Sequence, residues 1–180
     1  MSRIALDWAG SICDEILARG MRVRWHGIIN PLYVTRRLVR QMKKAGCMEV
    51  SLGFESGSDR MLRCLGKGFC VPDVRRSSRL LKEFEIRQTG LLLLGAPGED
   101  RASVGASFAL AETLQPEAKK VAVGVRVYPG TPLAKLAAAE HLPSEEAGLL
   151  EPVFYVSGAV WDWLADRAKE EVRSHPGWRL

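Results

Sequence analysis

The chain has 180 residues, of which 47% are hydrophobic and 26% are charged, with a formal net charge of +5. This length supports one domain with a sizeable core, or at most two small ones, and the composition is that of an ordinary globular protein. No apolar run approaches the roughly 18 residues of a membrane-spanning helix, and the N-terminus lacks the layout of a signal peptide, so we expect a cytoplasmic protein.

Four cysteines are scattered without a disulfide-rich pattern: Cys13, Cys47, Cys64 and Cys70. None of their separations forms a CxxC pair, so a zinc site is only weakly indicated. Free thiols are expected in a cytosolic protein, and we interpret these as small buried or half-buried side chains.

The densest basic segment is "TRRLVRQMKK", residues 35–44. Its apolar residues Leu38, Val39 and Met42 recur at helical spacing, which predicts an amphipathic helix with a solvated basic face. No aromatic residues interleave with the charges to stack on bases. A basic RNA-associated module using the arginines of residues 36–40 therefore stays as a weaker alternative.

Expected helices and strands alternate along the chain. In order, we expect a helix at 5–19, a strand at 21–27, a helix at 34–46, a strand at 47–54, helices at 58–66 and 71–84, a strand at 86–95, a helix at 101–114, a strand at 118–128 and a helix at 133–141. This alternation implies right-handed βαβ units and a parallel sheet. The nearly uninterrupted "GLLLLG" indicates a strand covered on both faces. About four strands make either an open doubly wound sheet or part of a (β/α) barrel.

The sequence after residue 141 has a different character. An extended aromatic piece is followed by a last helix at roughly 161–174, and three of the five tryptophans lie in this part. We therefore expect residues 1–141 to form the parallel α/β domain and residues 142–180 to form a C-terminal packing extension.

Each expected strand runs into a polar or glycine-rich turn, at residues 26–31, 53–59, 95–100 and 128–132. In both candidate architectures, ligands bind at the carboxyl ends of the strands. Four such turns at one edge of a sheet would form a single polar rim, which predicts a binding site there.

The turn "GFESGSD" offers one carboxylate and two hydroxyls, from Glu55, Ser56 and Ser58. These groups suit ribose hydroxyls or an ammonium group. The alternative is that Ser56 or Ser58 caps the helix beginning near Asp59, which explains one serine but leaves Glu55 unexplained.

The other turns are less specific. Gly95 allows close approach of the backbone to a planar ligand, whereas Glu99 equally suits a helix N-terminus. His26 and Asn30 could donate and accept hydrogen bonds in a pocket, although a histidine at a strand end is more often structural. The chain contains no GxSxG, HExxH or phosphate-loop motif. These residues therefore predict binding of a nucleoside-like ligand, without self-contained acid–base chemistry.

Three of these motifs occur in a familiar order and spacing. "GCMEVSLGFESGSDRML..LGKG", "GLLLLGAPGED" and "VRVYPGTPLA" resemble the later part of the catalytic domain of radical S-adenosylmethionine (radical SAM) enzymes. The resemblance covers most of residues 5–140 and is closest to members that often carry an N-terminal cobalamin-binding domain. It implies a partial (β/α) barrel, with strands three to six of six in this chain.

The resemblance also implies residue roles. Glu55, Ser56 and Ser58 match the fourth-strand motif, which contacts the ribose and methionyl parts of S-adenosylmethionine. Leu93 and Gly95 match the fifth-strand motif beside the adenine.

At the sixth-strand end, Val127 and Tyr128 match residues that also lie near the adenine. His26 and Asn30 correspond to the third-strand rim on the substrate side.

The chain departs from the family pattern in one major respect. Family members hold a [4Fe–4S] cluster with a CxxxCxxC loop after the first strand, and no such triplet occurs here. We therefore expect a truncated chain that is inactive by itself, with a free sheet edge that pairs with a separate N-terminal half-barrel chain or with itself. The alternative is a non-catalytic module that binds a nucleoside or S-adenosylmethionine.

Overall fold

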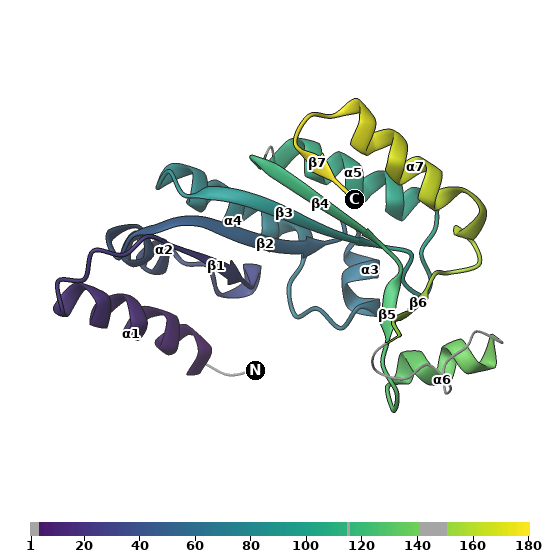
Figure 1. Ribbon diagram of the computed structural model, residues 1–180, viewed down its shortest axis with the longest axis horizontal. Coiled ribbons are helices and arrows are strands. Elements are labelled where there is room, and N and C mark those ends of the chain that lie inside the picture. Colours follow the sequence, from purple (N-terminus) through teal and green to yellow (C-terminus); the bar gives the residue numbers. More distant parts are fainter. Residues whose placement is uncertain (1–3, 115, 141–150) are drawn as a thin grey trace.

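A computed structural model describes residues 4–114, 116–140 and 151–180 (Figure 1). Five parallel strands form the main sheet, in the order β1-β2-β3-β4-β7. Their bounds are β1 Trp25–Ile29, β2 Cys47–Glu55, β3 Arg87–Leu94, β4 Ala118–Val123 and β7 Trp178–Arg179. Two short antiparallel strands, β5 Val125–Val127 and β6 Val153–Tyr155, form a second sheet. The predicted parallel α/β architecture is confirmed.

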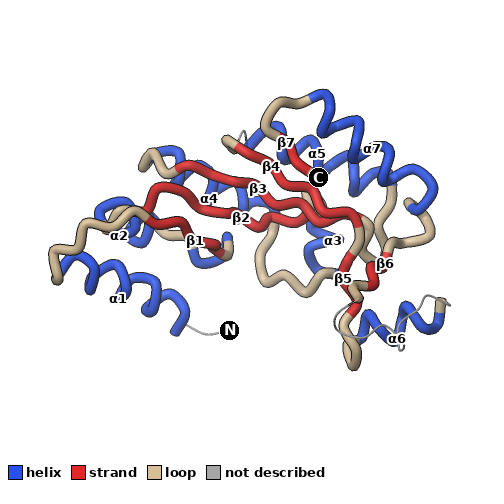
Figure 2. Tube along the Cα trace, in the orientation of Figure 1, coloured by secondary structure: helices blue, strands red, loops and turns tan. Residues whose placement is uncertain are grey.

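Helices connect and cover these strands (Figure 2). Their bounds are α1 Ile4–Ala18, α2 Arg36–Lys44, α3 Asp59–Cys64, α4 Val71–Glu83, α5 Arg101–Leu114, α6 Pro132–Ala139 and α7 Trp161–Ser174, with a 3-10 turn η1 at Pro31–Tyr33. The predictions for α5 and α7 match their bounds. None of the described helices is long and apolar enough to cross a membrane.

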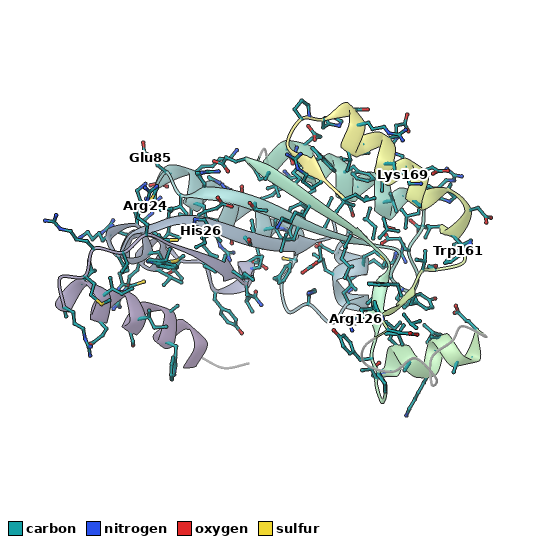
Figure 3. All side chains as sticks on the ribbon, viewed as in Figure 1. Arg24, His26, Glu85, Arg126, Trp161 and Lys169 are labelled. Atoms are coloured by element: carbon teal, nitrogen blue, oxygen red, sulfur yellow. The ribbon has the colours of Figure 1, made fainter. Side chains whose placement is uncertain are left out.

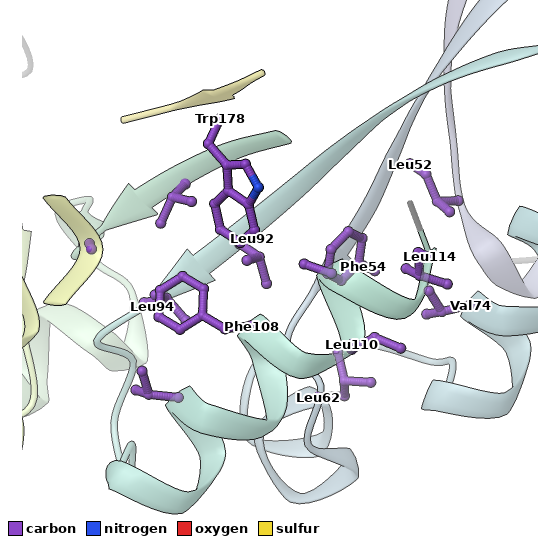
Figure 4. Close-up of a cluster of buried hydrophobic side chains, with 14 of the residues drawn as sticks. Leu52, Phe54, Leu62, Val74, Leu92, Leu94, Phe108, Leu110, Leu114 and Trp178 are labelled. Carbon is purple, nitrogen blue, oxygen red and sulfur yellow. The ribbon is translucent and has the colours of Figure 1, made fainter. Parts of the chain in front are cut away.

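One face of the main sheet carries the core. Helices α2, α4 and α5 pack against β2 and β3, and alternate strand residues such as Leu52, Phe54 and Leu92 point into this layer (Figure 4). Phe108 of α5 and Trp178 of β7 join the same cluster. The period-two alternation of the strands therefore selects which side chains meet the helices.

The opposite face of the sheet is open within the described residues. Leu91 and Leu93 of β3 are only half-buried, and Lys120 and Ala122 of β4 are exposed. The prediction that "GLLLLG" is covered on both faces is therefore wrong for this structure. In a closed barrel, the inner face of one strand is covered by side chains of the strands across the barrel, so an apolar strand does not by itself imply helices on both faces.

The basic segment forms α2, as predicted. Leu38, Val39 and Met42 are buried, and Thr35 caps the helix by accepting a hydrogen bond from the amide of Leu38. The charges lie on the solvent side, which confirms the amphipathic interpretation.

Strand β1 is an edge strand of the main sheet. Ile28, on its open face, is 83% exposed, and a mostly apolar cavity of about 280 Å³ lies between α1 and β1, lined in part by Ile12 and Trp25. Among the described residues no other strand pairs with this side of β1, and the edge is partly apolar, as predicted. Pairing of this edge with another chain or with a second copy stays a prediction.

The expected strand at 118–128 is divided at Gly124, whose φ of +91° lies in the left-handed region. After this residue the chain turns away as β5 (Figure 2). The last strand, β7, returns to pair with β4, a contact that the sequence did not indicate. The expected boundary between residues 141 and 142 lies outside the described residues.

Candidate functional site

The carboxyl ends of β1 to β4 lie at one edge of the main sheet because these strands are parallel. This edge, which we call the rim, carries the turns after Ile29, Glu55, Leu94 and Val123. The rim is the place where both sequence patterns and fold rules predict a ligand.

Glu55 ends β2 in an unusual backbone conformation. Its φ is +57°, and the register with β3 shifts between Gly53 and Glu55. Its carboxylate is 19% exposed and accepts a hydrogen bond from the ammonium of Lys67, with 3.1 Å between Oε1 and Nζ. A left-handed conformation costs a non-glycine residue free energy, and such residues cluster at ligand sites. The other described non-glycine residue of this kind, Glu85, follows the end of a helix, where left-handed residues are common.

Ser56 is fully buried and turned towards α5. Its Oγ lies 3.0 Å from the Oγ of Ser107, and the amide of Gly57 donates to the same Ser107 oxygen at 2.9 Å. Ser107 itself donates to the carbonyl of Ser103 at 2.8 Å. The strand end that carries Glu55 is thus tied to a helix by a buried polar network.

Ser58 caps α3. Its Oγ accepts a hydrogen bond from the amide of Met61, so the capping alternative is confirmed for this serine. A contact of Ser56 or Ser58 with a ligand stays a prediction, and in this structure both hydroxyls have partners within the protein.

Gly95 lies at the end of β3 with a φ of +92°. A Cβ atom at this position would lie 3.2 Å from side-chain atoms of both Leu164 and Val156. The carbonyl of Gly95 accepts a hydrogen bond from the amide of Ser157 at 2.9 Å. The glycine therefore permits close approach of the C-terminal segment to the rim. Leu93, two residues earlier, lies half-buried on the open face.

Glu99 is 1% exposed and holds the turn after β3. Its carboxylate accepts hydrogen bonds from the Oγ of Ser103 and, at 3.3 Å, from the amide of Gly95. Burial raises the pKa of this carboxyl above its ordinary value, and nearby Asp100 acts in the same direction, while these hydrogen bonds and Arg60 oppose the rise. Asp100, and not Glu99, caps α5: its carboxylate accepts a hydrogen bond from the amide of Ser103 at 2.8 Å.

This burial predicts a pH dependence of stability. A carboxyl whose pKa is raised by folding binds more protons in the folded state, so its contribution to the free energy of unfolding falls as pH rises above 4.5. We expect wild type to lose stability relative to Glu99→Gln as the pH is raised from 4.5 towards neutrality, measured by urea unfolding. The Asp100 pKa is lowered, mainly by the hydrogen bond from the Ser103 amide, so Asp100 titrates below this window. A constant difference between the two proteins across the window would contradict the prediction.

The remaining predicted residues take two different environments. Val127 is buried against α6, whereas Tyr128 is 46% exposed. His26 is exposed on β1, and Asn30 caps η1 by accepting a hydrogen bond from the amide of Leu32 at 2.9 Å. The structure therefore places Tyr128, but not the side chain of Val127, at the surface.

The described residues do not fit a [4Fe–4S] cluster. Among them, no group of three or more His, Cys, Asp and Glu side chains could hold a metal ion. Cys13 and Cys47 are buried in one apolar cluster, where burial raises the pKa of Cys47 to about 11 and disfavours a thiolate. Cys70 is half-buried, but Cys64 is exposed, which differs from the predicted burial.

The sequence interpretation assigned no role to three polar residues of this site: Lys67, Ser103 and Ser107. The two serines lie four residues apart on the expected helix at 101–114, so they share one face. A serine pair on the buried face of an otherwise apolar helix indicates internal hydrogen bonding, and this spacing could have revealed the network.

Two curated proteins are similar to this chain in sequence. An uncharacterized methyltransferase of Pyrococcus horikoshii is 28% identical over 128 residues, which are 71% of this chain and 28% of that protein. The anaerobic magnesium-protoporphyrin IX monomethyl ester cyclase of Cereibacter sphaeroides is 27% identical over 110 residues, 58% of this chain and 18% of that protein. The chain thus spans less than a third of the length of either relative. No protein-family model matches it.

A solved structure shares the fold over nearly the whole chain. The radical S-adenosylmethionine methyltransferase TsrM of Kitasatospora setae, with cobalamin and a [4Fe-4S] cluster bound, superposes with a TM-score of 0.81 at 19% identity. The match covers 98% of this chain and 43% of that chain. Sequence and fold together confirm the resemblance of this chain to the radical SAM superfamily.

Proposed function

We propose that the rim binds S-adenosylmethionine and that the chain serves as the cofactor-binding part of a radical SAM protein. The observation that carries this proposal is Glu55, a left-handed residue at a strand end with a mostly buried carboxylate. A solved structure of TsrM contains an S-adenosylmethionine analogue, and this chain shares its fold with a TM-score of 0.78.

The chain's own residues would hold and orient the cofactor. The Glu55 carboxylate can accept hydrogen bonds from ribose hydroxyls or from an ammonium group. The ammonium of Lys67, paired with this carboxylate, partly balances its negative charge.

Leu93 offers apolar contact on the open face, whereas the space beside Gly95 is taken by Leu164 and Val156. In the family, the bound cofactor supplies the radical that begins the reaction. The described thiols do not fit a [4Fe–4S] cluster. We therefore propose that the ligands of the cluster lie outside the described residues.

Calorimetric titration with S-adenosylmethionine tests the proposal, on anaerobically reconstituted chain whose iron content is measured in the same sample. Glu55→Gln removes a charged hydrogen-bond acceptor, and such a loss is worth about 1.5–3 kcal/mol. We therefore expect affinity to fall at least about tenfold. The matched control is Glu49→Gln, because Glu49 lies on the same strand, away from the rim, with a side chain 20% exposed.

An equal affinity of wild type and Glu55→Gln would refute the assignment of Glu55. Binding that is weakened by Glu55→Gln in a sample without iron would support the assignment of Glu55 without a cluster, which both the proposal and its alternative, a nucleoside-binding module without catalysis, expect.

A further inference from the structure

Glu55 is the central residue of a tight turn that ends β2. The amide of Ser56 donates a hydrogen bond to the carbonyl of Phe54 at 2.6 Å, and Glu55 between them has a φ of +57°. A positive φ under such a bond is the rare and strained form of the three-residue turn. Strained conformations persist only where the surrounding structure holds them. The contacts on both sides of Glu55 therefore decide whether its backbone keeps this form.

The turn places the Glu55 carboxylate over the open face of β2. A Cβ atom on Gly53 would lie 3.0 Å from the Oε1 of Glu55, and the same oxygen lies 3.1 Å from the Nζ of Lys67. The side chain thus folds back along its own strand. Loss of the left-handed backbone conformation would redirect this side chain, because side-chain direction is coupled to backbone conformation.

One serine of α5 holds the residues that follow Glu55. Ser107 donates its single hydroxyl proton to the carbonyl of Ser103 at 2.8 Å, so the proton in its 3.0 Å contact with Ser56 belongs to Ser56. The amide of Gly57 donates to the same Ser107 oxygen at 2.9 Å. Every donor and acceptor of the Ser107 hydroxyl is therefore used, and two of its three hydrogen bonds go to the turn.

Both anchors of the turn are buried. Before Glu55, the Phe54 ring is 1% exposed among the core side chains of Figure 4. After it, Ser56 and Ser107 are each fully buried. Alanine at residue 107 would leave the Ser56 hydroxyl and the Gly57 amide without their acceptor, and a buried donor without a partner is costly. Glu55 would then lose the constraint on its C-terminal side.

We propose that Ser107 is a positioning residue, which sets the affinity of the rim for S-adenosylmethionine by holding Glu55 in its left-handed conformation. Ser107 acts on the ligand only through the turn and does not touch it. The affinity part rests on the function proposed for the rim. The conformational part rests on the hydrogen bonds alone and is measured without any ligand.

NMR of the full chain tests the conformational part, because the Cα and Cβ chemical shifts of a residue depend on its φ and ψ. We expect Glu55 to show left-handed shifts in wild type and to move towards the shifts of an extended strand in Ser107→Ala. The internal control is Glu85, whose φ is +53°. Figure 3 shows Glu85 at the surface before β3, at the strand end opposite the rim, so its shifts should stay unchanged. The proposal is overturned if Glu55 keeps its left-handed shifts in Ser107→Ala.

Calorimetric titration with S-adenosylmethionine tests the affinity part. We expect Ser107→Ala to lower the affinity about tenfold, as Glu55→Gln does. In a Glu55→Gln background the same change should have at most about a twofold effect, because the carboxylate that Ser107 positions is already absent. An equal loss in both backgrounds would show that Ser107 does not act through Glu55.

The matched control is Ser77→Ala on α4. Ser77 is also fully buried, and its hydroxyl lies 2.9 Å from the carbonyl oxygen of Pro31 and 2.8 Å from that of Asp73. Neither carbonyl belongs to the turn at Glu55. We expect Ser77→Ala to lower stability and to leave the affinity unchanged, and an affinity loss as large as that of Ser107→Ala would contradict the proposal.

A second set of variants separates a loss of folding from a loss of positioning. Each serine variant is also made with Gly105→Ala, which we expect to stabilise α5. Recovery of wild-type affinity in Ser107→Ala with Gly105→Ala would overturn the positioning role. If wild type itself does not bind S-adenosylmethionine, the function proposed for the rim is refuted, whereas the shifts of Glu55 still decide whether Ser107 holds the turn.

Discussion

Replacing Trp178 by alanine is expected to lower the free energy of unfolding by about 3–5 kcal/mol. Trp178 is 2% exposed in β7, and its ring centre lies 5.5 Å from that of Phe108 on α5. The ammonium of Lys119 lies 4.6 Å from the centre of the same indole ring. Removing the indole therefore leaves a cavity at the contact between the C-terminal segment and the core (Figure 4). Urea unfolding followed by circular dichroism measures the loss.

The matched control for this prediction is Trp161→Ala, because Trp161 is 57% exposed at the start of α7. We expect its effect to stay within about 0.5 kcal/mol. Trp178→Phe should cost less than Trp178→Ala, because the buried indole Nε1 has no hydrogen-bond partner among the described residues. Equal midpoints for Trp178→Ala and Trp161→Ala would show that β7 does not stabilise the fold.

Gly57→Ala is expected to destabilise the protein by about 3 kcal/mol, the upper end of the usual cost of overpacking. A Cβ atom at residue 57 would lie 2.1 Å from the carbonyl oxygen of Ala106 and 2.8 Å from the Cα of Ser107. Backbone atoms of a helix cannot yield as a flexible side chain can. To relieve the overlap, α5 must move away from the turn, which breaks the hydrogen bond from the Gly57 amide to Ser107.

A second glycine provides the control on the same helix. A Cβ atom on Gly105 would have nothing within 4 Å beyond its own helix backbone and chain neighbours, and the residue lies inside α5. Gly105→Ala should therefore raise stability by about 0.5–1 kcal/mol, since alanine favours the helix. The prediction for residue 57 fails if both substitutions shift the urea midpoint in the same direction by similar amounts.

Local sequence signals were sufficient for most helices and strands. The expected helix at 101–114 matches α5, and the last helix at roughly 161–174 matches α7. Periodicity and caps act within one or two turns of chain, so they are readable without knowledge of the fold. The role of Ser58 as a cap follows from the same short-range chemistry.

Long-range packing decided the details that were missed. The expected strand at 118–128 divides at Gly124, where a Cβ atom would lie 3.0 Å from Phe154 and 3.3 Å from Val156, about thirty residues later. The pairing of β7 with β4 joins residues near 120 and 179, and no local pattern announces such a partner.

For the candidate site, the order of residues was enough to predict that Glu55 ends a strand. The alternation of strands with helices was enough to predict a parallel sheet whose polar turns share one edge. Three further features could be seen only in the folded chain: Ser56 faces Ser107, Glu99 is buried, and the C-terminal segment lies against the rim. Those features depend on which distant surface meets each side chain, and packing between remote segments sets that surface.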